Sequence, residues 1–440
     1  MTKFSDFGLI EPLQRALEAK GYTTPTPIQA QSIQPLLDGR DLCGIAQTGT
    51  GKTAAFALPS LQHLANANKP RPQQGCRMLV LAPTRELASQ IAESFVAYGK
   101  HLRLSVLTVF GGVPINRQIR QLQAGVDVLV ATPGRLLDLI DQRALHLRGV
   151  EIFVLDEADQ MLDLGFIHAL KRVDQLLPKK RQSLFFSATM PKTIAELGDR
   201  FLTDPVKVSV APPSTTAERV DQVAFYVNQA EKQALLNLHI KNETIDRALV
   251  FTRTKHGADR VVKHLAAAGI EANAIHGNKS QPQRERALAA FRSGETPILV
   301  ATDIAARGID VSGVSHVFNF ELPNVPEQYV HRIGRTGRAG REGIAIAFVA
   351  DDERPYLKSI EKLTRVRIAI SPLPENFRAA VEATPKVVIT RTPDQNRRHD
   401  GHRGEPRNGA PGNGAPKRRY GPKKGAVGAH RGAVTRAGGR

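Results

Sequence analysis

The chain has 440 residues, 41% of them hydrophobic, so it is too long for one typical core and has enough apolar side chains for two. Its two cysteines, Cys43 and Cys76, exclude a disulfide framework and a cysteine-based metal site. The formal net charge of +19 indicates a polyanionic partner. No apolar run approaches the ~18–20 residues of a membrane span and residues 1–12 show no signal-peptide pattern, so we expect a cytoplasmic protein.

The first element with a clear chemical meaning is the loop at residues 46–53, which follows an apolar run and opens a predicted helix. The loop consists of Ala46, Gln47, Thr48, Gly49, Thr50, Gly51, Lys52 and Thr53. Its glycines let backbone N–H groups turn toward phosphates, Lys52 can reach the β- and γ-phosphates, and the Thr53 hydroxyl can ligate Mg²⁺. The positive end of the following helix adds to this anion site. Although the strict pattern begins with glycine rather than Ala46, the loop predicts a nucleoside triphosphate site.

Short apolar segments alternate with amphipathic stretches along most of the chain. In order they are Met78–Ala82, Val126–Ala131, Ile152–Asp156, Ser183–Ser187, Arg247–Phe251, Ile298–Ala301 and Gly343–Phe348. Near-continuous apolar strands separated by helices predict parallel sheets covered on both faces, and therefore an α/β fold.

The alternation falls into two halves around residues 209–220, which contain Pro212 and Pro213 and are interpreted as a linker. Residues 129–132 and 299–302 share the sequence Leu-Val-Ala-Thr, and each segment ends a predicted strand. We therefore expect two related domains, at residues 1–208 and 221–372. The second has no Gly-Lys-Thr loop, so it should not hold its own nucleotide.

The apolar strand before Asp156 runs directly into Asp156, Glu157, Ala158 and Asp159. In α/β sheets, ligands bind at the carboxyl ends of the strands, so these acidic residues should lie at the nucleotide. Asp156 would hold Mg²⁺, through water, and Glu157 would orient or deprotonate the attacking water. The alternative is an acidic helix start that the helix dipole alone favours.

The C-terminal segment, residues 386–440, has a different composition from the rest. It carries 14 Lys/Arg against 3 Asp/Glu, a net of +11 that leaves +8 for the other residues. Its Gly, Pro and Asn content and single aromatic, Tyr420, predict disorder because no core can be buried. We interpret it as an electrostatic tether for nucleic acid, with a purely solubilising tail as the alternative.

Asp-Glu-Ala-Asp after such a loop, with further motifs in matching order along most of the chain, resembles the DEAD-box family of ATP-dependent RNA helicases. The start and the tail are most similar to the bacterial RhlE-type branch. The resemblance implies two tandem RecA-like domains, ATP and Mg²⁺ as cofactors, and RNA bound largely through its backbone. Ribosomal or RNA-processing proteins are candidate further partners.

Residues 21–29, within a start region at 2–30, resemble the family's adenine-reading element. The carboxamide of Gln29 has the donor and the acceptor that the N6 and N7 edge of adenine requires. The family pattern implies that Tyr22 stacks on the base and that Phe4 packs nearby.

His331 to Arg338 resembles the family element that completes the ATP site from the second domain. Arg335 and Arg338 lie at i and i+3, on one side of a helix. The resemblance implies that both act as arginine fingers on the γ-phosphate, that Asp303 contacts the ribose and that Asp310 orders the site. A basic helix that only faces RNA is the alternative. Coupling of ATP state to strand separation is implied for Ser187, Thr189 and His331.

Further segments resemble the elements with which the family grips RNA. In the first domain the residues are Arg85, Gly111, Gly112, Thr132, Gly134 and Arg135. In the second they are Arg253, Gln281, Arg284, Thr302, Arg307 and Gly308. Backbone contacts of this kind carry no sequence code, so little sequence preference is expected.

Three functions remain open at this point. The leading hypothesis is an RNA-dependent ATPase that locally unwinds short RNA duplexes or remodels ribonucleoproteins. An ATP-gated clamp without turnover is disfavoured because Lys52, Glu157, Arg335 and Arg338 are all present. A DNA helicase on the same plan is the third, since no residue is identified that reads a 2′-hydroxyl.

Overall fold

The computed structural model of the chain describes residues 2–47, 49–210, 220–306, 311, 313–337 and 343–385. Five predicted site residues lie outside these ranges: Thr48, Arg307, Gly308, Asp310 and Arg338. Most of the linker at 209–220 and the whole tail at 386–440 also lie outside the described residues.

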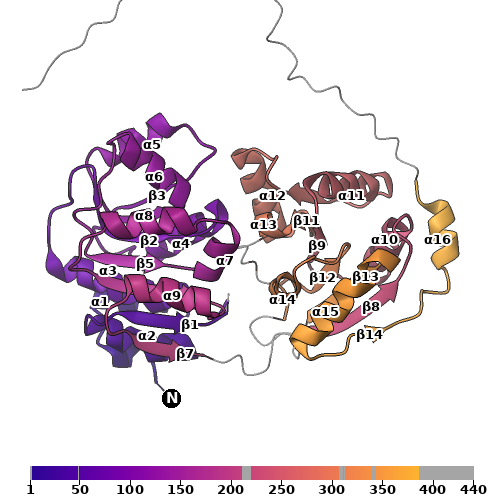
Figure 1. Ribbon diagram of the computed structural model, residues 1–440, viewed down its shortest axis with the longest axis horizontal. Helices are drawn as coiled ribbons and strands as arrows, with labels where there is room; N and C mark the ends of the chain where they lie inside the picture. Colours follow the sequence, from indigo (N-terminus) through magenta and orange to yellow (C-terminus); the bar gives the residue numbers. More distant parts are fainter. Residues whose placement is uncertain are drawn as a thin grey trace, which may run out of the picture. The chain divides into compact units, whose positions relative to one another are not determined.

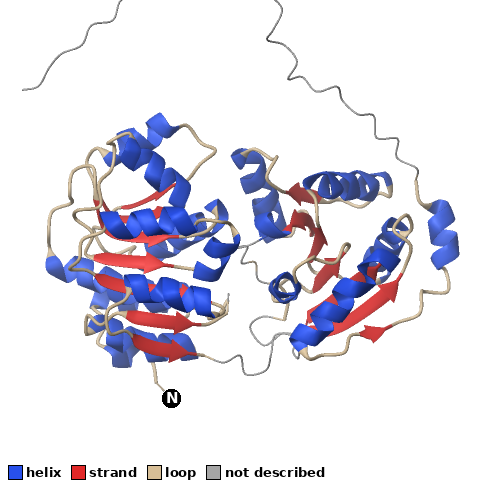
Figure 2. Cartoon of the chain, viewed as in Figure 1, coloured by secondary structure: helices blue, strands red, loops and turns tan. Residues whose placement is uncertain are grey.

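The first unit is a seven-stranded, all-parallel sheet with helices on both faces (Figures 1 and 2). Its strands are β1 (Leu42–Ile45), β2 (Cys76–Leu81), β3 (Val106–Val109), β4 (Val126–Ala131), β5 (Ile152–Leu155), β6 (Gln182–Ser187) and β7 (Val206–Ser209). Its helices are η1 (Phe4–Phe7), α1 (Glu11–Glu18), α2 (Pro27–Leu37), α3 (Lys52–Ala67), α4 (Arg85–Tyr98), α5 (Ile115–Leu122), α6 (Pro133–Asp141), α7 (Ala158–Asp163), α8 (Ile167–Leu176) and α9 (Lys192–Phe201).

The second unit is another seven-stranded parallel sheet. Its strands are β8 (Val220–Tyr226), β9 (Ala248–Thr252), β10 (Asn273–Ile275), β11 (Ile298–Thr302), β12 (His316–Asn319), β13 (Gly343–Val349) and β14 (Ala369–Ile370). Its helices are α10 (Lys232–Asn242), α11 (Lys255–Ala267), α12 (Gln281–Ser293), α13 (Asp303–Ala306), α14 (Pro326–Ile333), η2 (Asp351–Glu353), α15 (Arg354–Thr364) and α16 (Phe377–Ala383).

The two sheets have the same topology. The first is ordered β3-β4-β2-β5-β6-β1-β7 and the second β10-β11-β9-β12-β13-β8-β14, so each strand has a counterpart seven numbers later. The Leu-Val-Ala portions of the two repeats lie on β4 and β11, which are such counterparts. The prediction of two related, parallel α/β units is therefore confirmed.

The sheets are buried on both faces, as near-continuous apolar strands require. Along β2, Met78 and Val80 pack with the helices of one face, while Leu79 and Leu81 pack with those of the other. Such a strand cannot alternate apolar and polar side chains, because neither face meets water. Cys43 and Cys76 are buried and free, as expected for small apolar residues.

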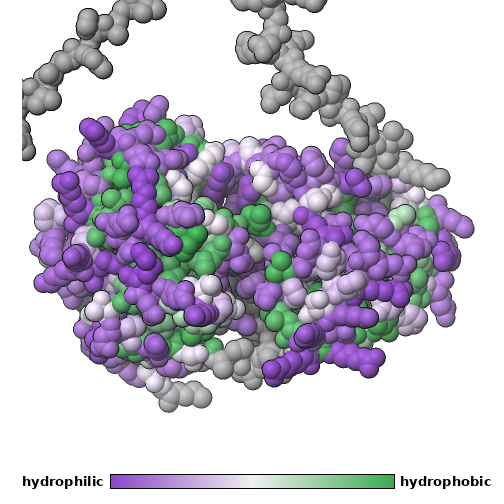
Figure 3. Space-filling model, in the orientation of Figure 1, coloured by the Kyte–Doolittle hydropathy of each residue, from purple (hydrophilic) through white to green (hydrophobic). Residues whose placement is uncertain are grey.

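The visible surface is mainly hydrophilic, with hydrophobic residues in separate patches (Figure 3). None of the helices in the described ranges combines the length and hydrophobicity that a bilayer crossing requires. Beyond residue 372, α16 packs on α10, and Phe377 is buried in the core of the second sheet.

The strand order divides the carboxyl edge of the first sheet into two parts. In the first sheet, β5, β6 and β1 are neighbours, and they lead into the acidic motif, Ser187 and the glycine-rich loop. The neighbours β3, β4 and β2 lead instead into the predicted RNA-binding segments. One half of the edge thus collects the nucleotide residues, and the other half collects the nucleic-acid candidates.

Candidate nucleotide site and nucleic-acid interface

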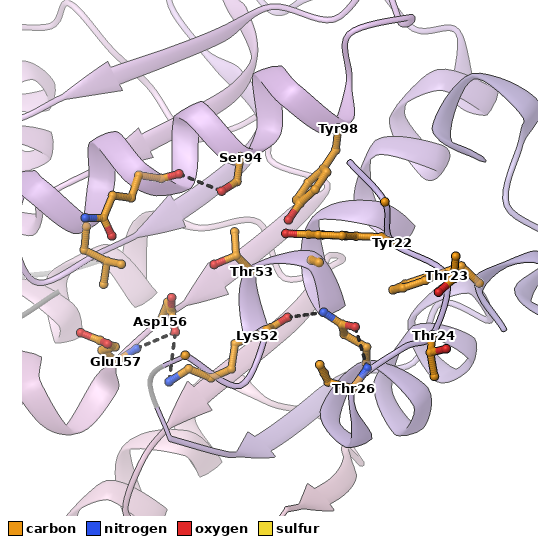
Figure 4. A pocket seen from close by; sticks show the side chains of 18 residues that line it. Tyr22, Thr23, Thr24, Thr26, Lys52, Thr53, Ser94, Tyr98, Asp156 and Glu157 are labelled. Carbon is orange, nitrogen blue, oxygen red and sulfur yellow. Dashed lines mark hydrogen bonds and ion pairs between the residues drawn. The ribbon is translucent and has the colours of Figure 1, made fainter. Parts of the chain in front are cut away.

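A cavity of about 520 Å³ lies at the carboxyl ends of β1 and β5 (Figure 4). It is lined by Tyr22, Gln29, Lys52, Thr53, Asp156 and Glu157, together with Thr26, Ser94 and Tyr98, which the sequence did not single out. Parallel strands end at one edge of the sheet, and this brings side chains more than a hundred residues apart into one pocket.

The glycine-rich loop has the backbone conformation that its glycines permit. Gly49 and Gly51 adopt φ of 84° and 90°, in the left-handed region that other residues avoid. A Cβ on Gly51 would lie 2.4 Å from Nε2 of Gln29. Glycine is therefore required there for two reasons, the dihedral angle and the close approach of Gln29. Ala46 is buried, and its N–H donates to the carbonyl of Ser187 at 3.0 Å, so strand pairing continues through this non-glycine position.

The start of α2 holds the glycine-rich loop from the side. The Thr26 hydroxyl donates to the Thr50 carbonyl at 2.8 Å, and Nε2 of Gln29 donates to the Gly51 carbonyl at 3.1 Å. Oε1 of Gln29 accepts the Thr26 N–H at 2.8 Å. The residue predicted to contact adenine thus also fixes the loop predicted to hold the phosphates.

Lys52 and Asp156 form a buried pair at the bottom of the cavity. The Lys52 ammonium lies 3.9 Å from Oδ1 of Asp156 and has no hydrogen-bond partner among the described residues. Burial raises the pKa of Asp156 to about 6, against the lowering effect of Lys52 and with a further rise from Glu157. A buried ammonium facing a cavity without a full partner suits an anionic ligand, since leaving it unpaired costs several kcal/mol.

Glu157 begins α7 in an unusual backbone conformation, with φ 53° and ψ 52°. Its N–H donates to Oδ1 of Asp156 at 2.9 Å. Left-handed backbone in a residue with a Cβ costs about 1–2 kcal/mol and is typical of functional sites. The turn places both acidic side chains at the lining of the cavity (Figure 4).

An aromatic surface lies at the rim of the cavity. Tyr22 is 41% exposed and stacks on Phe4, with ring centroids 6.5 Å apart and an interplanar angle of 22°. The ring centroids of Tyr98 and Tyr22 lie 6.4 Å apart. An exposed, supported ring at a pocket mouth is suited to stacking on a planar base. Phe4 packs where the sequence predicted it.

The acidic motif is hydrogen-bonded to the segment after β6. Oδ2 of Asp159 accepts the Thr189 hydroxyl at 3.1 Å and the N–H groups of Ala188 and Thr189 at 3.1 and 3.0 Å. The Ser187 hydroxyl accepts the Asp159 N–H at 3.3 Å. The family resemblance implied a coupling role for Ser187 and Thr189, but the sequence did not identify Asp159 as their acidic partner.

The nucleic-acid candidates of the first sheet form two local groups. Gly112 lies against Arg85, so that a Cβ there would be 2.0 Å from Nη1 of the arginine. Arg135 donates from Nη1 to the Val113 carbonyl at 3.1 Å and to Gln118 at 3.0 Å. Arg135 therefore shapes the loop after Gly112 in addition to carrying charge. Thr132 and Gly134 lie at the start of α6, where backbone N–H groups can donate hydrogen bonds to an anion.

In the second unit, Asp303, His331 and Arg335 line a small cavity together with Arg332. Arg332 is 1% exposed and grips Asp303 with two hydrogen bonds of 2.6 and 2.7 Å. Nε of Arg335 donates to the His331 carbonyl at 3.1 Å. The sequence assigned no role to Arg332, although it lies inside a recognised motif, because its partners come from other elements of the unit.

The nucleic-acid candidates of the second unit repeat the arrangement of the first. Arg253 follows β9, Gln281 and Arg284 follow β10, and Thr302 ends β11. These three strands are the counterparts of β2, β3 and β4 and are likewise neighbours. Both sheets thus carry their candidate residues at the carboxyl ends of the same three strands.

Within the described part of the chain, no cluster of three or more His, Cys, Asp or Glu side chains could hold a metal ion alone. Thr53 and Asp156 supply the oxygen ligands that Mg²⁺ prefers, and both line the cavity beside Lys52. One or two protein ligands suit Mg²⁺ when phosphates and water complete its shell, so the residues present fit the ion.

Comparison with known proteins agrees with this geometry. The profile of the DEAD/DEAH box helicases matches residues 26–197, and that of the helicase conserved C-terminal domain matches residues 230–340. The ATP-dependent RNA helicase CshA of Listeria monocytogenes is 45% identical over 370 residues, which are 84% of this chain and 70% of that protein. The chain belongs to the DEAD-box family of ATP-dependent RNA helicases. CshA of Bacillus subtilis is 43% identical over 362 residues, or 82% of this helicase and 72% of that one.

Solved structures show the same architecture as this helicase. S. cerevisiae Dbp5 bound to RNA and ADP BeF3 matches with a TM-score of 0.74 and 30% identity, over 87% of this chain and 98% of that one. Mss116p bound to ssRNA and AMP-PNP matches with a TM-score of 0.78 and 26% identity, over 88% and 83%. The tandem RecA-like fold is confirmed.

Proposed function

We propose that the cavity on the first sheet holds ATP with Mg²⁺. The observation that carries this proposal is the buried Lys52 ammonium, which has no hydrogen-bond partner among the residues that the structure describes. Lys52 would bind the β- and γ-phosphates, Thr53 and Asp156 would hold the metal, and Glu157 would orient the attacking water. When bound, the ion neutralises charge on the phosphate oxygens. The start of α3 contributes its positive dipole end to the same phosphates.

We assign base recognition to Tyr22 and Gln29. Tyr22 offers an exposed ring face at the mouth of the cavity. A carboxamide has two lone pairs and two N–H groups. Gln29 uses one lone pair for Thr26 and one N–H for Gly51, which leaves one of each for the N7 and N6 of adenine. This pairing would favour ATP over GTP.

The second unit would complete the ATP site with Arg335 and Arg338 acting on the γ-phosphate. Asp303 would contact the ribose and Asp310 would order the element. In this proposal the cleft between the two domains closes over ATP and RNA, and both ligands favour the closed state. Each therefore strengthens binding of the other by the same factor, of about 5–150. Ser187, Thr189 and His331 would couple closure to RNA. Closure would then open short duplexes locally, and hydrolysis would release the RNA.

RNA would lie along the carboxyl ends of β2, β3 and β4 and of their counterparts β9, β10 and β11. The residues assigned to it are Arg85, Gly111, Gly112, Thr132, Gly134, Arg135, Arg253, Gln281, Arg284, Thr302, Arg307 and Gly308. Glycine amides, helix starts and guanidinium groups meet phosphates and sugars, which fix position without reading sequence.

The test is the ATPase rate without nucleic acid, with RNA, and with single-stranded DNA of the same sequence and length. We expect RNA to stimulate hydrolysis strongly and DNA to stimulate it far less, as membership of a family of RNA helicases implies. The 2′-hydroxyl is the group by which a protein distinguishes RNA from DNA. A second RNA of scrambled sequence should stimulate as well as the first. Equal stimulation by RNA and DNA would contradict the RNA-specific interface.

The tail at residues 386–440 would tether RNA through its net charge of +11. Deleting it should weaken RNA binding and flatten the dependence of affinity on salt, because fewer counterions are released on binding. ATP hydrolysis without RNA should not change. The measurement is RNA affinity by fluorescence anisotropy between about 50 and 200 mM salt. Over this range, a protein that makes many phosphate contacts loses about 10³–10⁵ in affinity. An unchanged affinity and slope would leave the tail a solubilising role only.

The finer assignments belong to the same proposal. We place the first domain at residues 1–208, the linker at 209–220 and the second domain at 221–372. A cytoplasmic location stays an expectation from the sequence. We infer membership of the RhlE-type branch from the start and the tail; the curated relatives compared above are CshA proteins.

A further inference from the structure

We propose that Glu353 is a positioning residue for Arg253, a fixed buried carboxylate that holds the guanidinium at the carboxyl end of β9 for contact with RNA. This inference rests on the RNA-binding role proposed for Arg253. Every contact involved lies within the second unit.

Glu353 is fully buried at the end of η2 and has partners on several elements. Its carboxylate accepts the N–H of Leu322 at 3.1 Å and that of Ala350 at 3.0 Å. The Lys232 ammonium, at the start of α10, donates to the same carboxylate and to the Phe320 carbonyl at 2.9 Å. Two backbone donors and one ammonium leave the carboxylate little freedom to move.

The same carboxylate faces Arg253. Nη2 of Arg253 lies 3.3 Å from Oε1 of Glu353. The Arg253 side chain is 26% exposed while its partner is fully enclosed. The guanidinium therefore has an inner edge that contacts buried charge and an outer part that solvent, or a phosphate, can reach.

Three further contacts hold Arg253 in this place. The backbone N–H of Arg253 donates to Oε2 of Glu321 at 2.8 Å, and Nη1 of its guanidinium lies 3.5 Å from Oδ1 of Asn324. The guanidinium also lies over the Tyr356 ring, 5.9 Å from its centroid. An arginine that is ordered before binding loses less side-chain entropy when it meets a phosphate.

The buried pair itself offers little net stability, because removing two charges from water costs about as much as their attraction returns. Burial lowers the pKa of Lys232, and the carboxylate of Glu353 opposes that shift. Lys232 is the cationic partner of Glu353 inside the core, and both side chains are fully buried. What the pair adds is a negative charge at a defined point under Arg253.

The loop at residues 320–324, which contacts both Glu353 and Arg253, also contacts residues of the proposed nucleotide site. The Glu321 carbonyl accepts a hydrogen bond from Nη1 of Arg332 at 2.6 Å, and Arg332 holds Asp303. A general loosening of this segment would therefore disturb ATP use as well as RNA use. Loss of the Glu353 contact alone should affect RNA only.

The experiment compares Glu353→Gln, Arg253→Ala and the double variant in RNA-stimulated ATP hydrolysis. We expect the RNA concentration for half-maximal stimulation to rise about tenfold in each single variant, the loss typical of one charge-assisted contact. The double variant should be no worse than Arg253→Ala. KM for ATP, measured at saturating RNA, should stay within about twofold in all three, since neither Arg253 nor Glu353 lines the cavity that holds Asp303 and Arg335.

Glu243→Gln is the control for loss of a partly buried carboxylate in the same unit. Glu243 pairs with His239 and with His316 at the start of β12, whereas Arg253 follows the carboxyl end of the adjacent strand β9. This control should leave the RNA response unchanged.

Glu353→Gln leaves Lys232 with a neutral partner and could impair folding, so Lys232→Met combined with Glu353→Gln is the second variant. It removes both charges, and we expect near-native thermal unfolding with the same tenfold loss toward RNA. A native RNA response in this folded variant overturns the inference, as does a further loss when Glu353→Gln is added to Arg253→Ala. If Arg253→Ala alone binds RNA normally, the proposed RNA role of Arg253 fails instead.

Discussion

Replacing Arg335 with alanine should lower kcat of RNA-stimulated ATP hydrolysis by about 10³–10⁵, the contribution of an arginine that stabilises the γ-phosphate in phosphoryl transfer. The concentration of ATP at half-saturation should change far less, because the adenine and phosphate contacts proposed on the first sheet remain. RNA-stimulated phosphate release, measured at saturating ATP and RNA, provides the test.

Arg335 is buried and donates to the His331 carbonyl, so its removal could also loosen the second unit. Thermal unfolding of the variant separates that effect from catalysis. Arg354→Ala is the matched control, since Arg354 is an exposed arginine of the same unit that pairs with Asp351. A drop in kcat of less than tenfold in a folded Arg335→Ala protein would contradict the arginine-finger role.

Replacing Glu157 with glutamine should lower kcat by about 10²–10⁴, the usual contribution of a positioned general base. Glutamine keeps the shape of the side chain and its place at the start of α7 but cannot accept a proton from water. ATP and RNA should still bind, and their complex should persist because hydrolysis no longer ends it. Single-turnover hydrolysis together with the lifetime of the RNA complex measures both effects.

Asp163→Asn is the control for the Glu157 variant, because Asp163 is an exposed acidic residue at the other end of α7. It should hydrolyse ATP at the native rate. An unchanged rate in Glu157→Gln would show that another group orients the water.

The strands were predictable because both faces of each sheet are buried, which leaves runs of apolar residues that stand out locally. Residues 126–131 form β4 as predicted, while β5 ends at Leu155, one residue before the predicted Asp156. Strand ends are less certain because they depend on which backbone groups find a partner across the sheet. The short edge strand β14, at residues 369–370, has too few residues to leave a pattern.

The site residues divide in the same way. Lys52, Asp156 and Gln29 occur in motifs whose spacing reflects a local turn or helix start, so the sequence shows them directly. Arg332 and Glu353 do their work through partners on other strands and helices, such as Asp303 for the first and Lys232 for the second. No local spacing records those pairings, because the chain folds over many residues to make them.

By itself, the sequence determined the parallel α/β units, the nucleotide loop, the acidic motif and the family, since each depends on residues close together in the chain. Only the tertiary structure decided that the carboxyl edge of the first sheet divides into a half with the nucleotide candidates and a half with the nucleic-acid candidates, because strand order is not written in local pattern. It also showed Gln29 bonded to the glycine-rich loop and Arg253 held over a buried carboxylate. Such contacts arise when distant segments pack. A charge that this packing buries must have a partner beside it, because burying an unpaired charge costs free energy.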